Sequence, residues 1–515
     1  MKKMFFSAAA LMIGAVAMAQ ESPVLVSPST PTAATAPERA ASLFDEGETI
    51  ANTSQIDQYG TANAIDAFQS GQNQSVVVTQ AGESYNNAVL VVQAGDVTDE
   101  SGTGNTTEVN QFGVNDQATV GQYGDLNTAF VSQSGTGDAN KAVIAQGSDS
   151  AQQAERNAAS IDQSNQSNEA LIFQGFDDNN ASVAQSGYNN GARVTQDGGP
   201  NDGASYPNEI GQNASVAQSG DANIADVAQG LLEDSLVQSA ANATVDQSGY
   251  GNSANIVQDA TSDEPTDFFA NNNAAITQTG DGNIADQSQY GDSLFASSEQ
   301  SGYDNFSGQT QTGGINDLVN VQDGDAGIVF QTQDGYGNVA NATQTDGSYS
   351  NDLEQIQNGN NNDAIATQSG SNSGVRQEQT YGNGNYSLVD QSASNSTVKN
   401  LQQGYNNSSV VDQAGDWNEA DVQQIGDWNM STLDQAGWSN AALVTQFQRQ
   451  SSIIVQHGSD NQAAVFQQGP ADAPLVDPNA DSRFWLDPLE AGGPASIPSL
   501  EHLTIPSIGY HGNED

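Results

Sequence analysis

Residues 413–446 read QAGDWNEADVQQIGDWNMSTLDQAGWSNAALVTQ. Four glutamines in this stretch stand 11 residues apart, and after each of the first three a glycine follows two residues later and an asparagine five residues later. The repeated residues are Gln413, Gly415, Asn418, Gln424, Gly426, Asn429, Gln435, Gly437, Asn440 and Gln446. A strict interval of uncharged amides predicts a repeating structural unit, because fixed periods of this kind are the signature of stacked repeats.

The same spacing extends over most of the chain. Breaks at about 94–110, 197–217 and 259–277 predict loops. The runs of glutamines with 11-residue spacing are Gln58 to Gln80, Gln111 to Gln133, Gln163 to Gln196, Gln278 to Gln355, Gln357 to Gln379, Gln391 to Gln446 and Gln456 to Gln467.

The residues between two glutamines alternate in polarity. With glutamine as position zero, asparagine stands at position 5 and small or aliphatic residues at positions 7 and 9, as in Asn440, Ala442 and Val444. Most Asp, Glu, Ser and Thr fall at positions 6, 8 and 10. This alternation predicts a half-buried strand. A helix with an 11-residue repeat would instead place its apolar residues three and four apart.

One strand and one turn cannot bury a face alone, whereas stacked units can. We therefore predict an all-β fold, a two-sheet parallel β-solenoid of 22-residue coils built from 11-residue strand–turn units. Its N- and C-terminal segments are expected to be disordered or extended. Gln and Asn would form ladders of stacked amides, which uncharged groups tolerate at the interstrand spacing and carboxylates do not. Residues 58–467 would give on the order of 18 coils and a length of roughly 90 Å.

The two ends of the chain differ from the repeats. Lys2 and Lys3 precede an apolar run that ends at Ala19 in an A-x-A sequence, which predicts a signal peptide over 1–19 cleaved after Ala19. Residues 20–50 form a Pro/Ala/Thr/Ser-rich linker, 51–469 the repeats, and 470–515 a Pro-rich tail. The protein is accordingly expected to be secreted, in an extracellular, cell-surface or biofilm-matrix location.

The composition excludes several functions. The chain of 515 residues carries 63 acidic and 10 basic residues, a net charge of -53, and it has no cysteine. So acidic a protein is not expected to bind nucleic acid or an anionic membrane. Without cysteine it has neither disulfides nor thiolate sites. The three histidines are scattered, so no metal site, cofactor or catalytic group is predicted, and the chain is interpreted as non-enzymatic.

Two intact copies of the unit, QYGDLNTAFVSQ and QSGDANIADVAQ, resemble the curlin repeat of curli amyloid subunits. The resemblance covers about 51–469. It implies a β-solenoid that polymerises end to end into amyloid fibres, as subunit or nucleator, with roles in biofilm, adhesion and cell aggregation. It also implies self-association, other curli-type subunits and an outer-membrane secretion apparatus as partners. The ladder and turn residues of these copies are Gln122, Gly124, Asn127, Gln133, Gln218, Gly220, Asn223 and Gln229.

The turns supply the remaining candidate contacts. Asp recurs at position 3, which allows weak divalent-cation binding but lacks the paired glycines of calcium β-rolls. A 22-residue coil would place Asp281, Tyr303, Asp325 and Gly347 in one column, so that acids are rarely stacked on acids. Asp427 would likewise lie between Tyr405 and Arg449. Trp417, Trp428 and Trp438 occupy three successive turns, either as a surface contact or as shields of a sheet edge.

Two other classes of protein remain open. A monomeric β-solenoid adhesin or ice-binding protein would need capped ends and, for ice, regular threonine rows. A β-helix enzyme acting on polysaccharide would need coils of variable length and acids gathered at one place. The strict spacing and the mixed outward positions favour the self-assembling structural protein.

Overall fold

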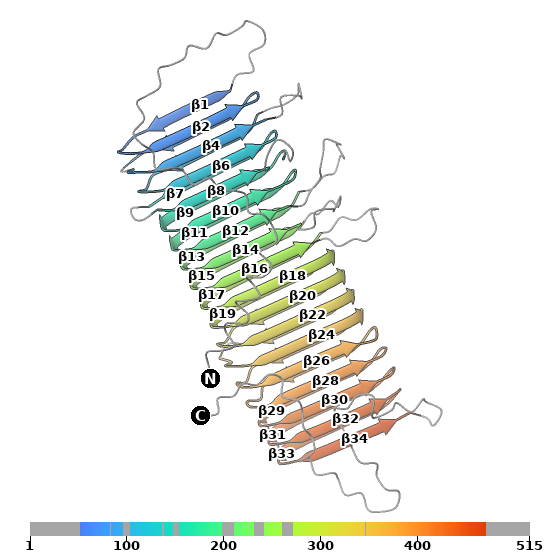
Figure 1. Cartoon of the computed structure of the whole chain (residues 1–515). Coiled ribbons are helices and arrows are strands. Elements are labelled where there is room, and N and C mark those ends of the chain that lie inside the picture. The colour runs from blue at the N-terminus through green and yellow to red at the C-terminus, as the bar shows by residue number, and fades with distance from the viewer. Residues whose placement is uncertain are drawn as a thin grey trace, which may run out of the picture.

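The computed structural model describes residues 52–82, 84–95, 104–135, 139–147, 154–197, 211–230, 241–259, 271–345 and 347–469. The predicted signal peptide with its cleavage at Ala19, the predicted linker over 20–50 and the predicted tail over 470–515 lie outside these residues. The described chain forms 34 strands and no helix, and the strands are stacked from β1 to β34 along one direction (Figure 1).

The odd-numbered strands form one parallel sheet of 17 strands. They are β1 (Thr53–Gln58), β3 (Ser75–Gln80), β5 (Thr106–Gln111), β7 (Thr128–Ser134), β9 (Ala158–Gln166), β11 (Asn180–Tyr188), β13 (Asn213–Asp221), β15 (Asn242–Tyr250), β17 (Asn273–Asp281), β19 (Phe295–Tyr303), β21 (Asp317–Gln322), β23 (Val339–Gln344), β25 (Asp363–Gln368), β27 (Tyr386–Gln391), β29 (Ser408–Asp416), β31 (Met430–Trp438) and β33 (Ser451–Ser459).

The even-numbered strands form the second parallel sheet, also of 17 strands. They are β2 (Ala64–Ser70), β4 (Ala88–Ala94), β6 (Gln117–Tyr123), β8 (Lys141–Gln146), β10 (Glu169–Gln174), β12 (Gly191–Gln196), β14 (Ile224–Gln229), β16 (Ser253–Asp259), β18 (Ile284–Asp292), β20 (Phe306–Gly314), β22 (Ile328–Tyr336), β24 (Asp352–Asn360), β26 (Gly374–Thr380), β28 (Thr397–Gln403), β30 (Glu419–Ile425), β32 (Ala441–Phe447) and β34 (Gln462–Gln468).

Each strand pairs with the strand two places along the chain, so one coil contains one strand of each sheet. Gln413 on β29 pairs with Gln435 on β31, and Gln424 on β30 pairs with Gln446 on β32. The predicted two-sheet parallel solenoid is therefore confirmed. The described chain makes 17 coils where about 18 were expected, because some coils are longer than 22 residues.

Extra residues lie in the turns and leave the strand register unchanged. Successive rungs of the glutamine ladder are 21 residues apart at the shortest and 33 at the longest. Two predicted positions change as a result. Gln333 bonds to Gln357 and not to Gln355, and Asp325 pairs with Tyr349 and not with Gly347. Both corrections have one cause. The coil between Gln333 and Gln357 has 24 residues and not 22, so two extra residues shift the later partners.

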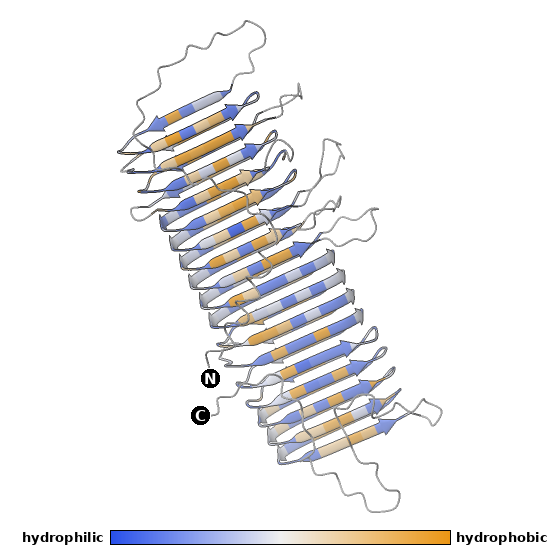
Figure 2. Cartoon of the chain, in the orientation of Figure 1, coloured by the Kyte–Doolittle hydropathy of each residue, from blue (hydrophilic) through white to orange (hydrophobic). Residues whose placement is uncertain are grey.

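The core lies between the two sheets and is built of small and branched side chains. Ala420, Val422, Ala442 and Val444 are buried, as their parity predicts. One apolar cluster extends from Val76 to Ala285 and a second from Val329 to Ile454. Between them the apolar core is reduced to three residues, Ala296, Leu318 and Ala340. Figure 2 shows the same change, since β18 and β20 carry mostly polar residues.

Candidate assembly surface: amide ladders, turns and terminal coils

The glutamines form two continuous ladders, one along each sheet. Gln413 donates through Nε2 to Oε1 of Gln435 at 2.7 Å, and Gln424 donates to Gln446 at 2.9 Å. The second Nε2 hydrogen of Gln424 is donated to the backbone oxygen of Ser408 on the facing sheet at 2.9 Å. Most glutamines of the ladders thus join consecutive coils and also join the two sheets, which satisfies both of their donors inside a dry core.

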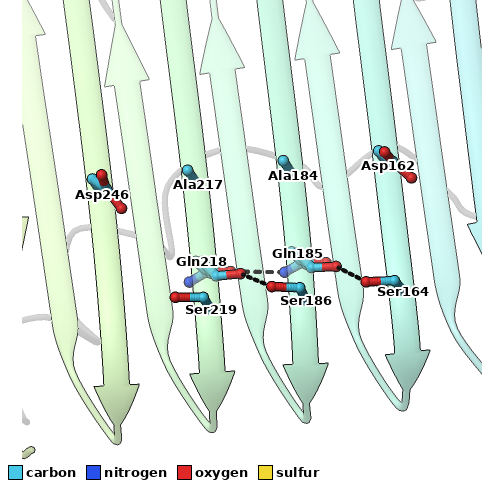
Figure 3. A pocket seen from close by; sticks show the side chains of 9 residues that line it. All are labelled: Asp162, Ser164, Ala184, Gln185, Ser186, Ala217, Gln218, Ser219 and Asp246. Carbon is cyan, nitrogen blue, oxygen red and sulfur yellow. Dashed lines mark hydrogen bonds between the residues drawn. The ribbon is translucent and has the colours of Figure 1, made fainter.

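The other glutamines of the predicted units have the same contacts. Their side chains are buried, and each donates to the glutamine of the next coil at 2.8 or 2.9 Å. The bonds are Gln122 to Gln146, Gln133 to Gln163, Gln218 to Gln247 and Gln229 to Gln258. Figure 3 shows one such rung, in which Gln185 donates to Gln218 at 2.8 Å beside outward-facing Ser186 and Ser219.

Asparagine forms a second pair of ladders immediately before most of the strands. Asn440 donates its backbone N–H to Oδ1 of Asn418 at 3.0 Å, and its Nδ2 donates to the same oxygen at 3.1 Å. Asn429 bonds in the same way to Asn407. Asn127 and Asn223 donate their backbone N–H groups to the asparagines of the coil before. The asparagine ladder therefore holds the end of each turn to its neighbours.

One acid interrupts the asparagine ladder. Asp116 occupies the asparagine position between Asn87 and Asn140, and it is buried. Its Oδ1 accepts from the backbone N–H of Asn140 at 3.0 Å. Burial raises the pKa of Asp116 to about 6, and burial likewise raises the pKa of Asp177 to about 7 and that of Asp352 to about 6. For Asp116 and Asp177 desolvation of the charged form outweighs the hydrogen bonds that the carboxylate accepts, and for Asp352 desolvation acts together with the charge of Glu354.

We expect Asp116→Asn to stabilise the protein at pH 8 by on the order of 2 kcal/mol. A carboxyl with a folded pKa above its unfolded value binds protons more tightly in the fold, so stability increases as pH falls through the folded value and levels off below the unfolded value of about 4. Wild type should therefore gain stability between pH 8 and pH 4. Urea unfolding across this range would test it, and an Asp116→Asn variant with an unchanged pH profile and unchanged stability would contradict it.

A third ladder lies inside the core, and the sequence pattern did not reveal it. It occupies the position two residues before the edge glutamine, where most coils carry Val or Ile. Each rung donates to the next at 2.7 or 2.8 Å, along Gln287, Gln309, Gln331, Gln355 and Gln377 of β18, β20, β22, β24 and β26. We call these five residues the inner glutamine ladder. The sequence does contain a sign of this ladder, because glutamine recurs five times at the position two residues before the edge glutamine. A polar residue at a position expected to be apolar, however, is easily interpreted as an interruption of the repeat.

The turns contain glycine where the backbone requires it. Gly415, Gly426 and Gly437 have φ of +97°, +90° and +124°, a region that residues with a side chain avoid. The predicted glycines Gly124 and Gly220 are alike, with φ of +110° and +93°. At four of these five glycines, all but Gly426, an added Cβ would overlap a backbone oxygen of the next coil. Glycine therefore supplies both the conformation and the room for close stacking of turns.

Acids in the turns are largely separated by other residues. Tyr405 donates its backbone N–H to Oδ1 of Asp427 at 3.0 Å, and Arg449 donates its backbone N–H to the backbone oxygen of Asp427. Asp125 is an exception, because backbone hydrogen bonds place it, Glu155 and Asp177 in successive coils. Outward-facing acids also stack, in the row Asp390, Asp412 and Asp434. Burial, and then its two acidic neighbours, raise the pKa of Asp412.

The three tryptophans are exposed but do not form one patch. Trp417 follows β29 and Trp438 is the last residue of β31, so both lie at one edge of the stack, whereas Trp428 follows β30 and lies at the opposite edge. Trp417 and Trp428 have positive φ of 60° and 59°. The candidate surface contact is therefore divided between two edges, and on the shared edge Trp438 is in register with Asp416 and not with Trp417.

An open hollow lies on the outward face of the odd-numbered sheet. Ala184 and Ala217 form its floor between Asp162 and Asp246, and Ser164, Ser186 and Ser219 border it (Figure 3). The hollow exists because small residues separate two acids in the same row. Within the described ranges no group of three or more His, Cys, Asp or Glu residues has an arrangement that could hold a metal ion. The described residues also include no helix that could span a membrane.

Among the described residues, the glutamine ladders end with opposite polarity in the two terminal coils. Within the described ranges no residue donates to Oε1 of Gln58 or Gln69 in the first coil, whose amides donate forward to Gln80 and Gln93. In the last coil Gln456 and Gln467 each use one Nε2 hydrogen, on the backbone oxygens of Ala441 and Ser451. In the glutamine ladders the first coil thus offers amide acceptors and the last coil offers amide donors.

The fold and its ladders define a parallel β-solenoid with amyloid-like stacking of identical amides. A comparison with known families matches the curlin associated repeat to residues 102–135, 401–426 and 415–447, so the chain contains curlin repeats. This family is structural and not enzymatic, and its proteins are extracellular fibre components. A comparison with curated proteins gave no match.

Proposed function

We propose that this protein is a secreted structural protein, a curli-like fibre subunit or nucleator that assembles by stacking the last coil of one molecule on the first coil of the next. The observation that carries the proposal is the opposite polarity of the two terminal coils. A donor end that meets an acceptor end makes a head-to-tail contact, and such a contact produces an open filament and not a closed dimer. The match to curlin repeats supports the same function.

The side chains of the two ends also match in register. Continuing β33 onto β1 would place Ser452 on Ser54, Ile454 on Ile56 and Gln456 on Gln58. Continuing β34 onto β2 would place Ala463, Val465 and Gln467 on Ile65, Ala67 and Gln69. On the odd-numbered sheet the inward residues Ser, Ile and Gln are the same in both terminal strands. On the even-numbered sheet Ala463 and Val465 would face Ile65 and Ala67, so a small residue meets a large one at each position and the core volume at the junction is nearly conserved. Outward-facing Phe466 would lie over Phe68.

Assembly of this kind would serve the biofilm matrix, adhesion and cell aggregation. We propose export by an outer-membrane secretion apparatus, with other curli-type subunits as further partners and weak divalent-cation binding by the outward carboxylates. The net charge of -53 repels molecules that approach one another. Fibre growth should therefore be faster at low pH, at high salt or with divalent cations.

We expect Ile454→Lys to abolish fibre growth while most coils stay folded. Ile454 faces the interior of the last coil, where a lysine would place a charge at the junction. Ile453→Lys is the matched control, because Ile453 on the same strand faces solvent. Electron microscopy and fibre diffraction of residues 20–515 after removal of denaturant give the measurement.

Wild-type fibres with a cross-β pattern, lost in the Ile454→Lys variant and kept in the Ile453→Lys variant, support the proposal. Fibres from both variants would show that growth does not depend on stacking of the last coil on the first coil. A folded wild-type chain that forms no fibres would overturn the assembly function and favour the alternative of a monomeric β-solenoid surface adhesin.

A further inference from the structure

One edge of the solenoid carries a row in which tyrosine and aspartate alternate. The row occupies the same turn position after seven successive odd-numbered strands, as the strand register, one turn hydrogen bond and the isolated bridges show. Its members are Tyr188, Asp221, Tyr250, Asp281, Tyr303, Asp325 and Tyr349. We call these residues the Tyr/Asp row. The spacing of 22 residues reveals only Asp281, Tyr303 and Asp325, and the full alternation is visible in the stacked structure, because insertions make the other separations unequal.

The aspartates of the row have a structural role. Asp221 accepts the backbone N–H of Tyr188 through Oδ1 at 3.2 Å, and Asp281 and Asp325 accept the same group of Tyr250 and Tyr303 at 3.0 Å. Each acid therefore holds the turn of the coil before it. Alternation also keeps any two carboxylates two coils apart, which reduces their repulsion.

Turn packing does not explain the tyrosines. Further along the same edge the position is occupied by Ser371 and Ser394, so a small polar residue is sufficient to separate the acids. The side chains of Tyr188, Tyr250, Tyr303 and Tyr349 are nevertheless exposed, at 47%, 62%, 58% and 56%. A regular line of exposed aromatic rings on a rigid edge is typical of a binding surface and not of isolated apolar residues.

The spacing of the row indicates the shape of its partner. Tyrosines on alternate coils are about 9.5 Å apart, twice the interstrand distance. A partner must be straight, must present an apolar face at this interval and must carry hydroxyl groups for the carboxylates between the rings. An extended β-1,4-linked glycan has these properties, since its two-sugar repeat is close to this length and each sugar has an apolar face. An anionic polymer would be repelled by the acids of the row.

We propose that the Tyr/Asp row binds an extended, neutral β-1,4-linked polysaccharide along the axis of the solenoid. Tyr188, Tyr250, Tyr303 and Tyr349 stack on every second sugar. One ring on one sugar binds weakly, but four rings on one rigid edge act together, so the affinity depends on their number and spacing. The site is complete within one molecule and does not depend on fibre formation.

The test uses monomeric residues 20–515, freshly diluted from denaturant, with hydroxyethylcellulose in affinity electrophoresis. The variant Tyr250→Ser with Tyr303→Ser removes the centre of the row. The matched control is Tyr336→Ser with Tyr405→Ser, which removes two exposed tyrosines of the opposite edge. Circular dichroism establishes that both variants keep their strands. We expect about a tenfold loss of affinity in the row variant and a change of less than about twofold in the control.

Amylose, an α-1,4-linked glucan that coils, serves as the second probe and should bind much more weakly. Three results would overturn the proposal: no retardation of the wild type by hydroxyethylcellulose, an equal loss in the two variants, or equal binding of amylose. Because fibre growth is measured separately on the same preparations, loss of glycan binding with intact fibres, or the reverse, distinguishes this inference from the proposed assembly.

Discussion

Gln424→Glu is expected to lower the free energy of unfolding by about 3–5 kcal/mol at pH 8, the cost of an uncompensated buried charge. Gln424 is fully buried, accepts from Gln402 at 2.8 Å and donates to Gln446 and to the backbone of Ser408. A carboxylate can accept the first of these bonds but cannot donate the other two. Hydrogen exchange of β28, β30 and β32, together with urea unfolding, gives the measurement.

Gln117→Glu is the control, because the Gln117 side chain is exposed on the outward face of β6, beside Ala88 and Lys141. The same charge should there cost less than about 1 kcal/mol. Acid should partly rescue the Gln424→Glu variant, since a protonated carboxyl regains one donor. Equal destabilisation by the two substitutions, or a Gln424→Glu variant as stable at pH 8 as at pH 4, would mean that the ladder does not need uncharged amides.

Gly437→Ala is expected to cost about 2–4 kcal/mol, for two independent reasons. Gly437 has φ of +124°, and a Cβ at this residue would overlap the backbone oxygen of Gly458 in the next coil. The turns before β32 would have to separate, and the bonds that hold Asn440 would weaken. Gly191→Ala is the matched control, because nothing lies within 4 Å of a Cβ there and Gly191 is not among the residues with positive φ. Thermal unfolding of the two variants should differ by several degrees, and a null result for both would exclude turn packing as a source of stability.

Much of this fold follows from residue types alone. The 11-residue spacing and the parity of Asn440, Ala442 and Val444 are sufficient to predict parallel strands, two sheets and amide ladders, because strand geometry leaves no other arrangement for alternating side chains. Spacing could not decide between Gln355 and Gln357, which face the same side of β24 and differ only in which ladder they join. The full Tyr/Asp row could not be predicted either, because the coils that contain it differ in length and a constant period does not show which residues are stacked.

The inner glutamine ladder has a consequence for the order in which coils find one another. Seventeen nearly equivalent coils could stack in many wrong combinations, since Ala and Val at core positions fit any neighbour. Gln309, Gln331 and Gln355 each accept from one glutamine and donate to the next, and each would lose both of these bonds if it were stacked between aliphatic rungs. These buried glutamines therefore favour one stacking order of the coils in the middle of the chain. The coils on both sides are aligned as a consequence.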